Sequence, residues 1–255
     1  MTPQEPKDRI IIPLDVPTVG EAIQLVNSLG PHVGQFKIGL QFINTIIHSV
    51  ISPVSRGDAM DNLDSIRTLF TMLFGKIFWD GKFDDIPNTV GGATTPIANL
   101  RVKMINVHAS AGIPAMMEAV ANRGDAIVLA VTVLTSFEEN DGHLTFGAPT
   151  KAKVIQFARD AKLAGVQGII CSPKELEILK KKPELRDLIT VIPGIRPTWS
   201  AINDQERVTT PTEAIKSGAD YLVIGRPITK PPKEIGGPVE AAKKIADEIA
   251  AALTA

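Results

Sequence analysis

The sequence predicts one α/β domain, residues 1–255, folded as a (β/α)8 TIM barrel. Short segments rich in Val and Ile alternate with amphipathic helical patterns along the whole chain. Near-continuous apolar strands separated by helices are typical of a parallel sheet whose outer face is covered by helices. Eight such strands in 255 residues match the size of a barrel. A doubly wound open sheet is the alternative, but the first strand is not followed by G-x-G-x-x-G, which disfavours a dinucleotide-binding fold.

The predicted strands have the apolar, β-branched composition of buried strands, and they occupy residues 9–15, 34–40, 75–82, 103–109, 126–134, 168–172, 188–195 and 221–227. The predicted helices have apolar residues at three-to-four spacing and often open with Thr or Pro, and they occupy residues 18–29, 113–123, 150–165, 173–182, 210–219 and 237–253. After the second strand, residues 52–65 are polar and rich in turn formers, whereas residues 66–75 have an amphipathic pattern. We expect a loop followed by a helix there.

Composition and charge narrow the class of function. The formal net charge of −1 argues against an extended nucleic-acid surface, so a bound anion should be small and held locally. The single cysteine, Cys171, excludes an internal disulfide and a cysteine-rich metal site, which suits a reducing compartment. The first nine residues are polar and unlike a signal peptide, and no apolar run approaches the length of a membrane span. We expect a cytoplasmic protein with no nucleic-acid or membrane partner.

Charged or reactive residues stand at the carboxyl ends of the predicted strands, which form the active-site mouth in barrels of this kind. In chain order they are Asp15, Lys37 (inside the second strand), Asp80, Lys82, His108, Thr135, Ser136, Cys171, Ser172, Arg196, Gly225 and Arg226. Their repetition at one end of the predicted barrel indicates a functional site there.

Several of these residues also have a purely structural explanation. Asp15 suits a turn before a helix, and Lys37 could extend its ammonium group to the rim of the sheet. His108 could be a hydrogen-bonded structural histidine. Cys171 has no activating neighbour in the sequence, so we expect a small buried hydrophobe. Asp84 is expected to be a solvated loop charge.

The stretch WDGKFDDIPNT, residues 79–89, places charges at the end of a buried strand. Burying charges is costly unless they pair, so a chemical purpose is indicated. Because side chains alternate along a strand, Asp80 and Lys82 share a face that a barrel strand can direct into the central cavity. A chance ion pair between them is the alternative. The chain must turn near Pro87, so Asp85 lies outside this alternation.

The end of the last strand carries a signature of anion binding. Barrels frequently bind phosphate at the loops after strands seven and eight. Gly225 allows backbone N–H groups to approach an anion, and Arg226 offers a bidentate guanidinium group. The sequence GRP alone is a weak signal, but PGIRP and NDQERV strengthen it.

Together, LDVP, FKIG, DGKFDDIPNT, NVHASAG, AVTVLTS, PGIRP and GADYLVIGRPIT resemble the orotidine 5′-phosphate decarboxylase family over nearly the whole chain. The resemblance implies a (β/α)8 barrel and a homodimer with shared active sites. It implies conversion of orotidine 5′-phosphate to uridine 5′-phosphate and CO2, in pyrimidine nucleotide synthesis, with no metal or organic cofactor.

The resemblance also implies roles for individual residues. Lys37, Asp80, Lys82 and Asp85 would form an alternating charged network, in which Lys82 is the proton donor. Asp85 and Thr89 would reach into the site of the partner subunit.

The implied substrate contacts fall into three groups. The ribose would be held by Asp15, Lys37 and Thr89. The pyrimidine would lie near Thr135 and Ser136. The phosphate would be held by Gln205, Gly225 and Arg226, with Arg196 beside them. Residues 196–208 are the candidate lid.

Two residues depart from the family pattern. Gly81 and Asp84 stand where family members usually have Leu and His. Gly81 is expected to loosen the strand, and Asp84 adds a negative charge near the network. Neither change removes a required group.

The chemistry of the residues is consistent with this assignment. Loss of CO2 from an sp2 carbon leaves electron density without a conventional sink, so the site must stabilise a carbanion electrostatically. The Lys82 ammonium group can do so and then deliver a proton.

Two other functions remain open from the sequence. One is a related magnesium-dependent barrel acting on sugar phosphates, of the hexulose-phosphate synthase or keto-gulonate-phosphate decarboxylase type, which also carries a D-x-K-x-x-D string. The other is a non-catalytic nucleotide-binding barrel, disabled by Gly81 and Asp84.

Overall fold

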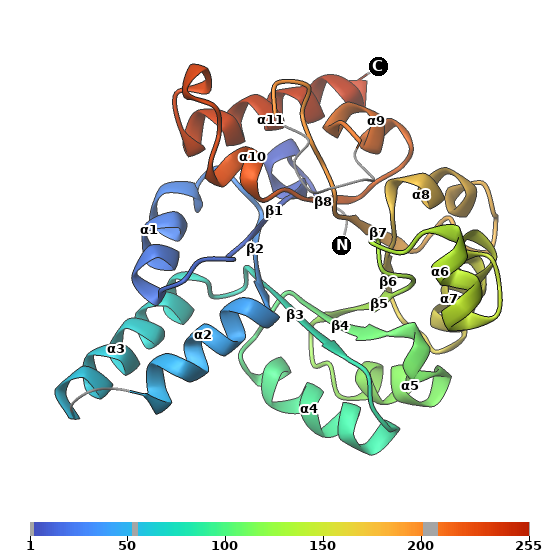
Figure 1. The fold of residues 1–255 in the computed structure, drawn as a ribbon, viewed down its shortest axis with the longest axis horizontal. Coiled ribbons are helices and arrows are strands. Elements are labelled where there is room, and N and C mark those ends of the chain that lie inside the picture. The colour runs from blue at the N-terminus through green and yellow to red at the C-terminus, as the bar shows by residue number, and fades with distance from the viewer. Residues whose placement is uncertain (1–2, 53–55, 201–208, 255) are drawn as a thin grey trace.

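Eight parallel strands close into a barrel in the order of the sequence, from β1 to β8 and back to β1 (Figure 1). The structure, a computed structural model, describes residues 3–52, 56–200 and 209–254. The strands are β1 Ile10–Pro13, β2 Gln35–Gly39, β3 Ile77–Phe83, β4 Met104–His108, β5 Ile127–Val131, β6 Gly168–Ile170, β7 Ile189–Ile192 and β8 Tyr221–Val223. The predicted (β/α)8 fold is confirmed.

Helices surround the barrel on its outer side (Figure 1). They are α1 Val19–Leu29, α2 Leu40–Ile51, α3 Arg56–Met72, α4 Pro87–Asn99, α5 Ile113–Ala121, α6 Glu139–Phe146, α7 Thr150–Leu163, α8 Pro173–Lys180, α9 Pro211–Lys216, α10 Arg226–Thr229 and α11 Pro238–Thr254, with short 3-10 turns η1 Pro6–Arg9, η2 Ala109–Ala111 and η3 Lys233–Ile235. Side-chain caps explain several starts: Thr18, Ser172 and Thr210 each accept a backbone N–H from the first turn of their helix.

The expectation for residues 52–65 was wrong, because most of this polar stretch is helical. Helix α3 begins at Arg56 rather than at Ile66, and α2 precedes it. Leu69 of α3 and Leu73 just after it are fully buried, while Asp58, Asp61 and Asp64 in the first half of the helix are exposed to solvent. Polar composition therefore reflected an exposed helix face rather than a loop. The two helices pack together and project from one side of the barrel (Figure 1).

Helices α2, α4, α6 and α10 lie where the sequence pattern predicted no helix. For α4 the physical reason is clear, because Gly91, Gly92 and Pro96 give it a low intrinsic helix propensity. Its helical form is supported by packing against α5. Tertiary contacts outweigh local preference there.

The core has two parts. The larger lies between the strands and the surrounding helices. The smaller fills the amino-terminal part of the barrel interior, and we call it the barrel floor; it consists of Ile11, Phe78, Met104, Ile127, Leu129, Val191 and Tyr221. The floor closes the barrel beneath the carboxyl ends of the strands, where the polar residues gather.

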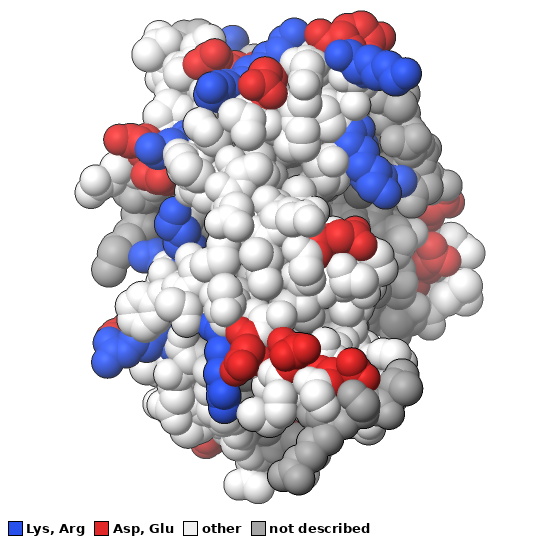
Figure 2. Space-filling view, turned by 90° about the vertical axis from the view of Figure 1, so that its left-hand side faces the viewer, with Lys and Arg blue, Asp and Glu red and all other residues white. Residues whose placement is uncertain are grey.

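The exterior carries mixed charge. Figure 2 shows one side of the molecule, where Lys and Arg side chains are scattered among Asp and Glu and leave a broad uncharged area between them. Among the described residues, no helix combines the length and the apolar character that crossing a bilayer requires.

Candidate active site

Three charged side chains meet at the carboxyl end of the barrel. The Lys37 ammonium nitrogen lies 2.8 Å from Asp80 Oδ2, and the Lys82 ammonium nitrogen lies 2.7 Å from Asp80 Oδ1. Asp15 extends this group, with its Oδ1 3.9 Å from Lys37 Nζ. The structure thus brings together four of the predicted site residues, and Asp80 is the carboxylate shared by the two lysines.

Asp80 is the most deeply buried member of this group, with a side chain only 7% exposed. Burial would raise the pKa of its carboxyl group, but the positive charges of Lys37 and Lys82 and their hydrogen bonds hold the pKa below its usual value. Asp80 therefore carries a fixed negative charge at neutral pH. Lys37 is only 14% exposed, so its side chain is engaged inside the barrel rather than extended to the rim.

The meeting of Asp80 and Lys82 does not follow from simple strand alternation. Trp79 pairs with Ile105 and Phe83 with Val107, so residues 80–82 lie opposite a single residue of β4, Asn106. Lys82 adopts a left-handed backbone conformation, with φ of 50°. This β-bulge turns the Lys82 side chain back toward Asp80.

Sequence reasoning missed Asn106. This residue is fully buried in the apolar strand β4, and its amide bonds both to Asp80 and to the backbone of Lys82. The signal was available in the sequence, since an amide inside the run MINV must find partners when it is buried.

Two neighbouring cavities, which share Lys37, Pro193 and Val223 in their linings, lie beside the charged group. The inner cavity, about 220 Å³, is lined by Lys37, Asp80, Lys82 and Thr135 and by apolar residues that include Phe78 and Val191 of the barrel floor. The outer cavity, about 710 Å³, is lined by Asp15, Lys37, Gly194, Arg196, Gly225 and Arg226 among others. Both cavities reach Lys37, so one elongated ligand can occupy the two together.

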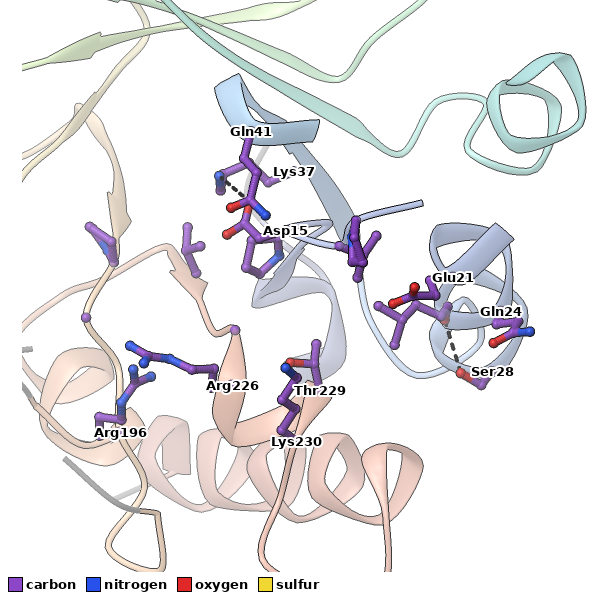
Figure 3. A pocket seen from close by; sticks show the side chains of 18 residues that line it. Asp15, Glu21, Gln24, Ser28, Lys37, Gln41, Arg196, Arg226, Thr229 and Lys230 are labelled. Atoms are coloured by element: carbon purple, nitrogen blue, oxygen red, sulfur yellow. Dashed lines mark hydrogen bonds and ion pairs between the residues drawn. The ribbon is translucent and has the colours of Figure 1, made fainter. Parts of the chain in front are cut away.

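The outer cavity has one end of mixed charge and one cationic end. Figure 3 shows Asp15 beside Lys37 at one end, and the guanidinium groups of Arg196 and Arg226 directed toward each other at the other. Arg196 is buried and Arg226 is exposed. Two neighbouring guanidinium groups repel each other and favour an anion between them. The predicted anion site thus has both of its arginines in one cavity.

Other predicted residues lie apart from the charged group. Asp85 is exposed, and its Oδ1 accepts the backbone N–H of Ile86 at 2.7 Å. Thr89 is exposed in the first turn of α4. Ser136 is exposed next to Thr135 and is not among the described residues that line the inner cavity. Gln205 and most of the candidate lid, residues 201–208, lie outside the described residues.

The structure also bears on three further residues. Cys171 is fully buried, and burial raises the pKa of its thiol, which confirms the expected small hydrophobe. Asp84 is exposed, as expected, and accepts a hydrogen bond from the Ser110 hydroxyl at 3.3 Å. Burial lowers the pKa of His108, while the negative charge of Asp84 opposes this shift.

The departure at Gly81 has a packing explanation. A Cβ atom at this position would lie 2.7 Å from Trp79 Nε1 and 3.0 Å from Phe83 Cε1. These aromatic side chains therefore occupy the space that a leucine would need.

Comparison with known proteins identifies the family of this chain. The sequence profile of the orotidine 5′-phosphate decarboxylase / HUMPS family matches residues 8–245. The chain is 40% identical to the orotidine 5′-phosphate decarboxylase of Heliobacterium modesticaldum, over 98% of each chain. It is 39% identical to that of Syntrophomonas wolfei, over 95% of this chain and 98% of the relative.

A solved structure is similar over the same extent. The crystal structure of the orotidine 5′-phosphate decarboxylase of Lactobacillus acidophilus superposes with a TM-score of 0.72 at 29% identity, covering 94% of this chain and 98% of the other. By its fold and its sequence, this chain belongs to the orotidine 5′-phosphate decarboxylase / HUMPS family.

Proposed function

We propose that this protein is a carbon–carbon lyase that converts orotidine 5′-phosphate to uridine 5′-phosphate and CO2, a step of pyrimidine nucleotide synthesis. The observation that carries the proposal is the Lys37–Asp80–Lys82 group at the edge of a small, largely apolar cavity. The curated relatives named orotidine 5′-phosphate decarboxylase support it over nearly the full chain.

The inner cavity takes the pyrimidine, near Thr135 and Ser136, with its carboxylate beside Asp80. The bond between C6 and the carboxylate breaks, and its electron pair remains on C6. The Lys82 ammonium group stabilises this carbanion and transfers a proton to C6. Because the Asp80 carboxyl stays ionised, it repels the substrate carboxylate in the ground state.

The outer cavity takes the ribose and the phosphate. Asp15 and Lys37, at one end, contact the ribose hydroxyls. Arg226 and Gly225 hold the phosphate at the other end, with Arg196 beside them. The family resemblance adds Gln205 to the residues that bind the phosphate. The phosphate is remote from the reacting carbon, so its binding energy serves to hold the pyrimidine in the inner cavity.

The protein acts as a homodimer with shared active sites. Asp85 and Thr89 are exposed at the start of α4, away from the cavities of their own chain. Both side chains are thus available to complete the charged network and the ribose contacts of a partner subunit.

The reaction needs no metal or organic cofactor. Both carboxylate oxygens of Asp80 already bind ammonium groups, so this residue is a poor ligand for magnesium. This arrangement disfavours the magnesium-dependent sugar-phosphate alternative.

We place the protein in the cytoplasm, without nucleic-acid or membrane partners, on the basis of its charge and its single cysteine.

A spectrophotometric assay with orotidine 5′-phosphate in the presence of EDTA tests the proposal. Turnover that is unaffected by EDTA is the expected result. Turnover of a sugar phosphate that appears only with added magnesium would establish the related lyase instead. Binding of uridine 5′-phosphate without any turnover would identify a non-catalytic nucleotide-binding barrel.

A further inference from the structure

The bulge in β3 leaves a local gap in the barrel's hydrogen bonding. Residues 80–82 face Asn106 alone, because the regular pairing of β3 with β4 stops at Trp79 and resumes at Phe83. Lys82, with φ of 50°, holds a left-handed conformation that a residue other than glycine rarely adopts. Such a conformation persists only where the surroundings fix it.

The Asn106 side chain fills this gap. The backbone N–H of Lys82 donates to Asn106 Oδ1 at 2.8 Å, and Asn106 Nδ2 donates to Asp80 Oδ1 at 2.6 Å. The orientation of the amide is unambiguous, because a backbone N–H can only donate and an ionised carboxylate can only accept. Asn106 is fully buried, so water does not compete for these bonds.

These contacts close a ring of hydrogen bonds. Asp80 Oδ1 accepts from both Asn106 Nδ2 and Lys82 Nζ, and the Lys82 backbone donates back to Asn106. The ring fixes Lys82 at two points, its backbone nitrogen and its ammonium group. Asn106 is not among the described residues that line the inner cavity, whereas Asp80 and Lys82 are.

We propose that Asn106 is a positioning residue, which holds the Lys82 ammonium group and the Asp80 carboxylate in their reactive arrangement. The inference rests on the proposed decarboxylase function. Asn106 acts through Asp80 and Lys82, without touching the substrate. Its loss should therefore lower the rate of the chemical step and leave nucleotide binding nearly unchanged, because the phosphate is held at the far end of the outer cavity.

Two variants test the role. Asn106→Ala removes both hydrogen bonds. Asn106→Asp keeps the shape of the side chain and the acceptor for the Lys82 N–H, but places a second carboxylate against Asp80. The titratable groups around this pair are Lys37, Lys82, His108 and Asp84. The matched control is Thr190→Val, which removes hydrogen bonds of a buried hydroxyl to Asp220 and Gly218, away from both cavities.

The measurement is kcat per nucleotide-binding site, with the number of sites determined by calorimetric titration with uridine 5′-phosphate. Both Asn106 variants should lose at least about tenfold in kcat per site, because a displacement of about 1 Å in a reactive group can cost about 10²-fold in rate. Their affinity for uridine 5′-phosphate should stay close to that of the wild type. Thr190→Val should lower the melting temperature but keep the wild-type kcat per site.

The proposal is overturned if either folded Asn106 variant keeps kcat per site within about twofold of the wild type. It is also overturned if only the number of binding sites falls, which is the behaviour of a merely structural residue. If the wild type itself releases no CO2, the decarboxylase assignment fails. Crystal structures then decide the positioning role, since the Asn106→Ala variant must show an altered Lys82 backbone and a longer Lys82–Asp80 distance.

Discussion

A Cβ atom placed on Gly39 would lie 2.6 Å from the ammonium nitrogen of Lys37. Gly39 ends β2 with φ of −100° and ψ of 177°, which any residue can adopt. A glycine is therefore required at position 39 because the Lys37 ammonium group approaches closely, and not because of the backbone conformation there. The ammonium group passes over this position to reach Asp80 Oδ2.

Gly39→Ala should separate Lys37 from Asp80 while preserving the fold, because the clash falls on the flexible end of a side chain. We expect kcat/KM for orotidine 5′-phosphate to fall about 10²-fold, as a displacement of about 1 Å in a reactive group can cause. Steady-state kinetics and a melting curve measure both effects. Gly20→Ala is the control, since the nearest atom to its Cβ would be 4.0 Å away. Equal activity in the two variants would contradict the prediction.

In the proposed mechanism Lys82 is the proton donor and the cation that stabilises the carbanion, and Lys82→Ala removes both. Decarboxylation should fall by at least about 10³-fold, within the range that a positioned acid contributes. Binding of uridine 5′-phosphate should remain measurable by calorimetry. Lys181→Ala, which removes an exposed lysine paired with Glu177, should change neither quantity. Near-normal turnover in Lys82→Ala would remove Lys82 from the mechanism.

Arg226→Ala tests the phosphate end of the outer cavity. It should lower kcat/KM for orotidine 5′-phosphate by about 30-fold or more, which corresponds to about 2 kcal/mol for a truncated charge pair. The slow reaction of the nucleoside that lacks the phosphate should hardly change, because the lost interaction is then absent from both enzymes. Arg159→Ala, at a surface ion pair with Glu184, is the control. Equal losses on both substrates would show that Arg226 supports the fold instead.

Asp84→His restores the usual family residue at an exposed position. Stability in chemical denaturation should change by no more than about 0.5 kcal/mol, as for most surface substitutions. The negative charge of Asp84 favours protonated His108, so its removal should lower the pKa of His108 further. An NMR titration of the histidines measures this shift. A higher pKa for His108, or a large change in kcat, would show that Asp84 acts on the charged group in another way.

Subunit exchange tests whether the active sites are shared. In a mixed dimer of the inactive variants Lys82→Ala and Asp85→Ala, one site receives both lesions and the other combines an intact Lys82 with an intact Asp85. Mixing should restore activity to about a quarter of the wild type for random pairing. If each chain builds its own site, every site carries a lesion, and a mixture with verified exchange stays inactive.

The barrel was predictable because apolar strands alternate with amphipathic helices along the chain, and because charged or reactive residues stand at or just after the carboxyl ends of the predicted strands. Asp80, Lys82 and Arg226 could be placed at one end of the fold for the same reason. Helix α4 could not be predicted, because its glycines and its proline argue locally against a helix that tertiary packing supports.

The finer geometry of the site was beyond the sequence pattern. Alternation along β3 predicted that Asp80 and Lys82 lie close together, but a β-bulge with Lys82 in a left-handed backbone conformation is what brings them together. The requirement for Gly39 depends on where the end of Lys37 lies, and a local pattern carries no such information. Asn106 is the exception, because a lone amide in an apolar strand can be recognised from the sequence.

The barrel floor closes the inner cavity on the side opposite the mouth of the barrel. Phe78 and Val191 belong to the floor and also line that cavity, so CO2 released beside Asp80 has no exit below. The gas and the nucleotide must leave through the same opening. A carbanion confined with the CO2 that it has just released can recombine with it, and the reaction then runs backward. In the proposed mechanism, proton transfer from Lys82 therefore has a second consequence: by consuming the carbanion before the gas escapes, it makes the cleavage irreversible.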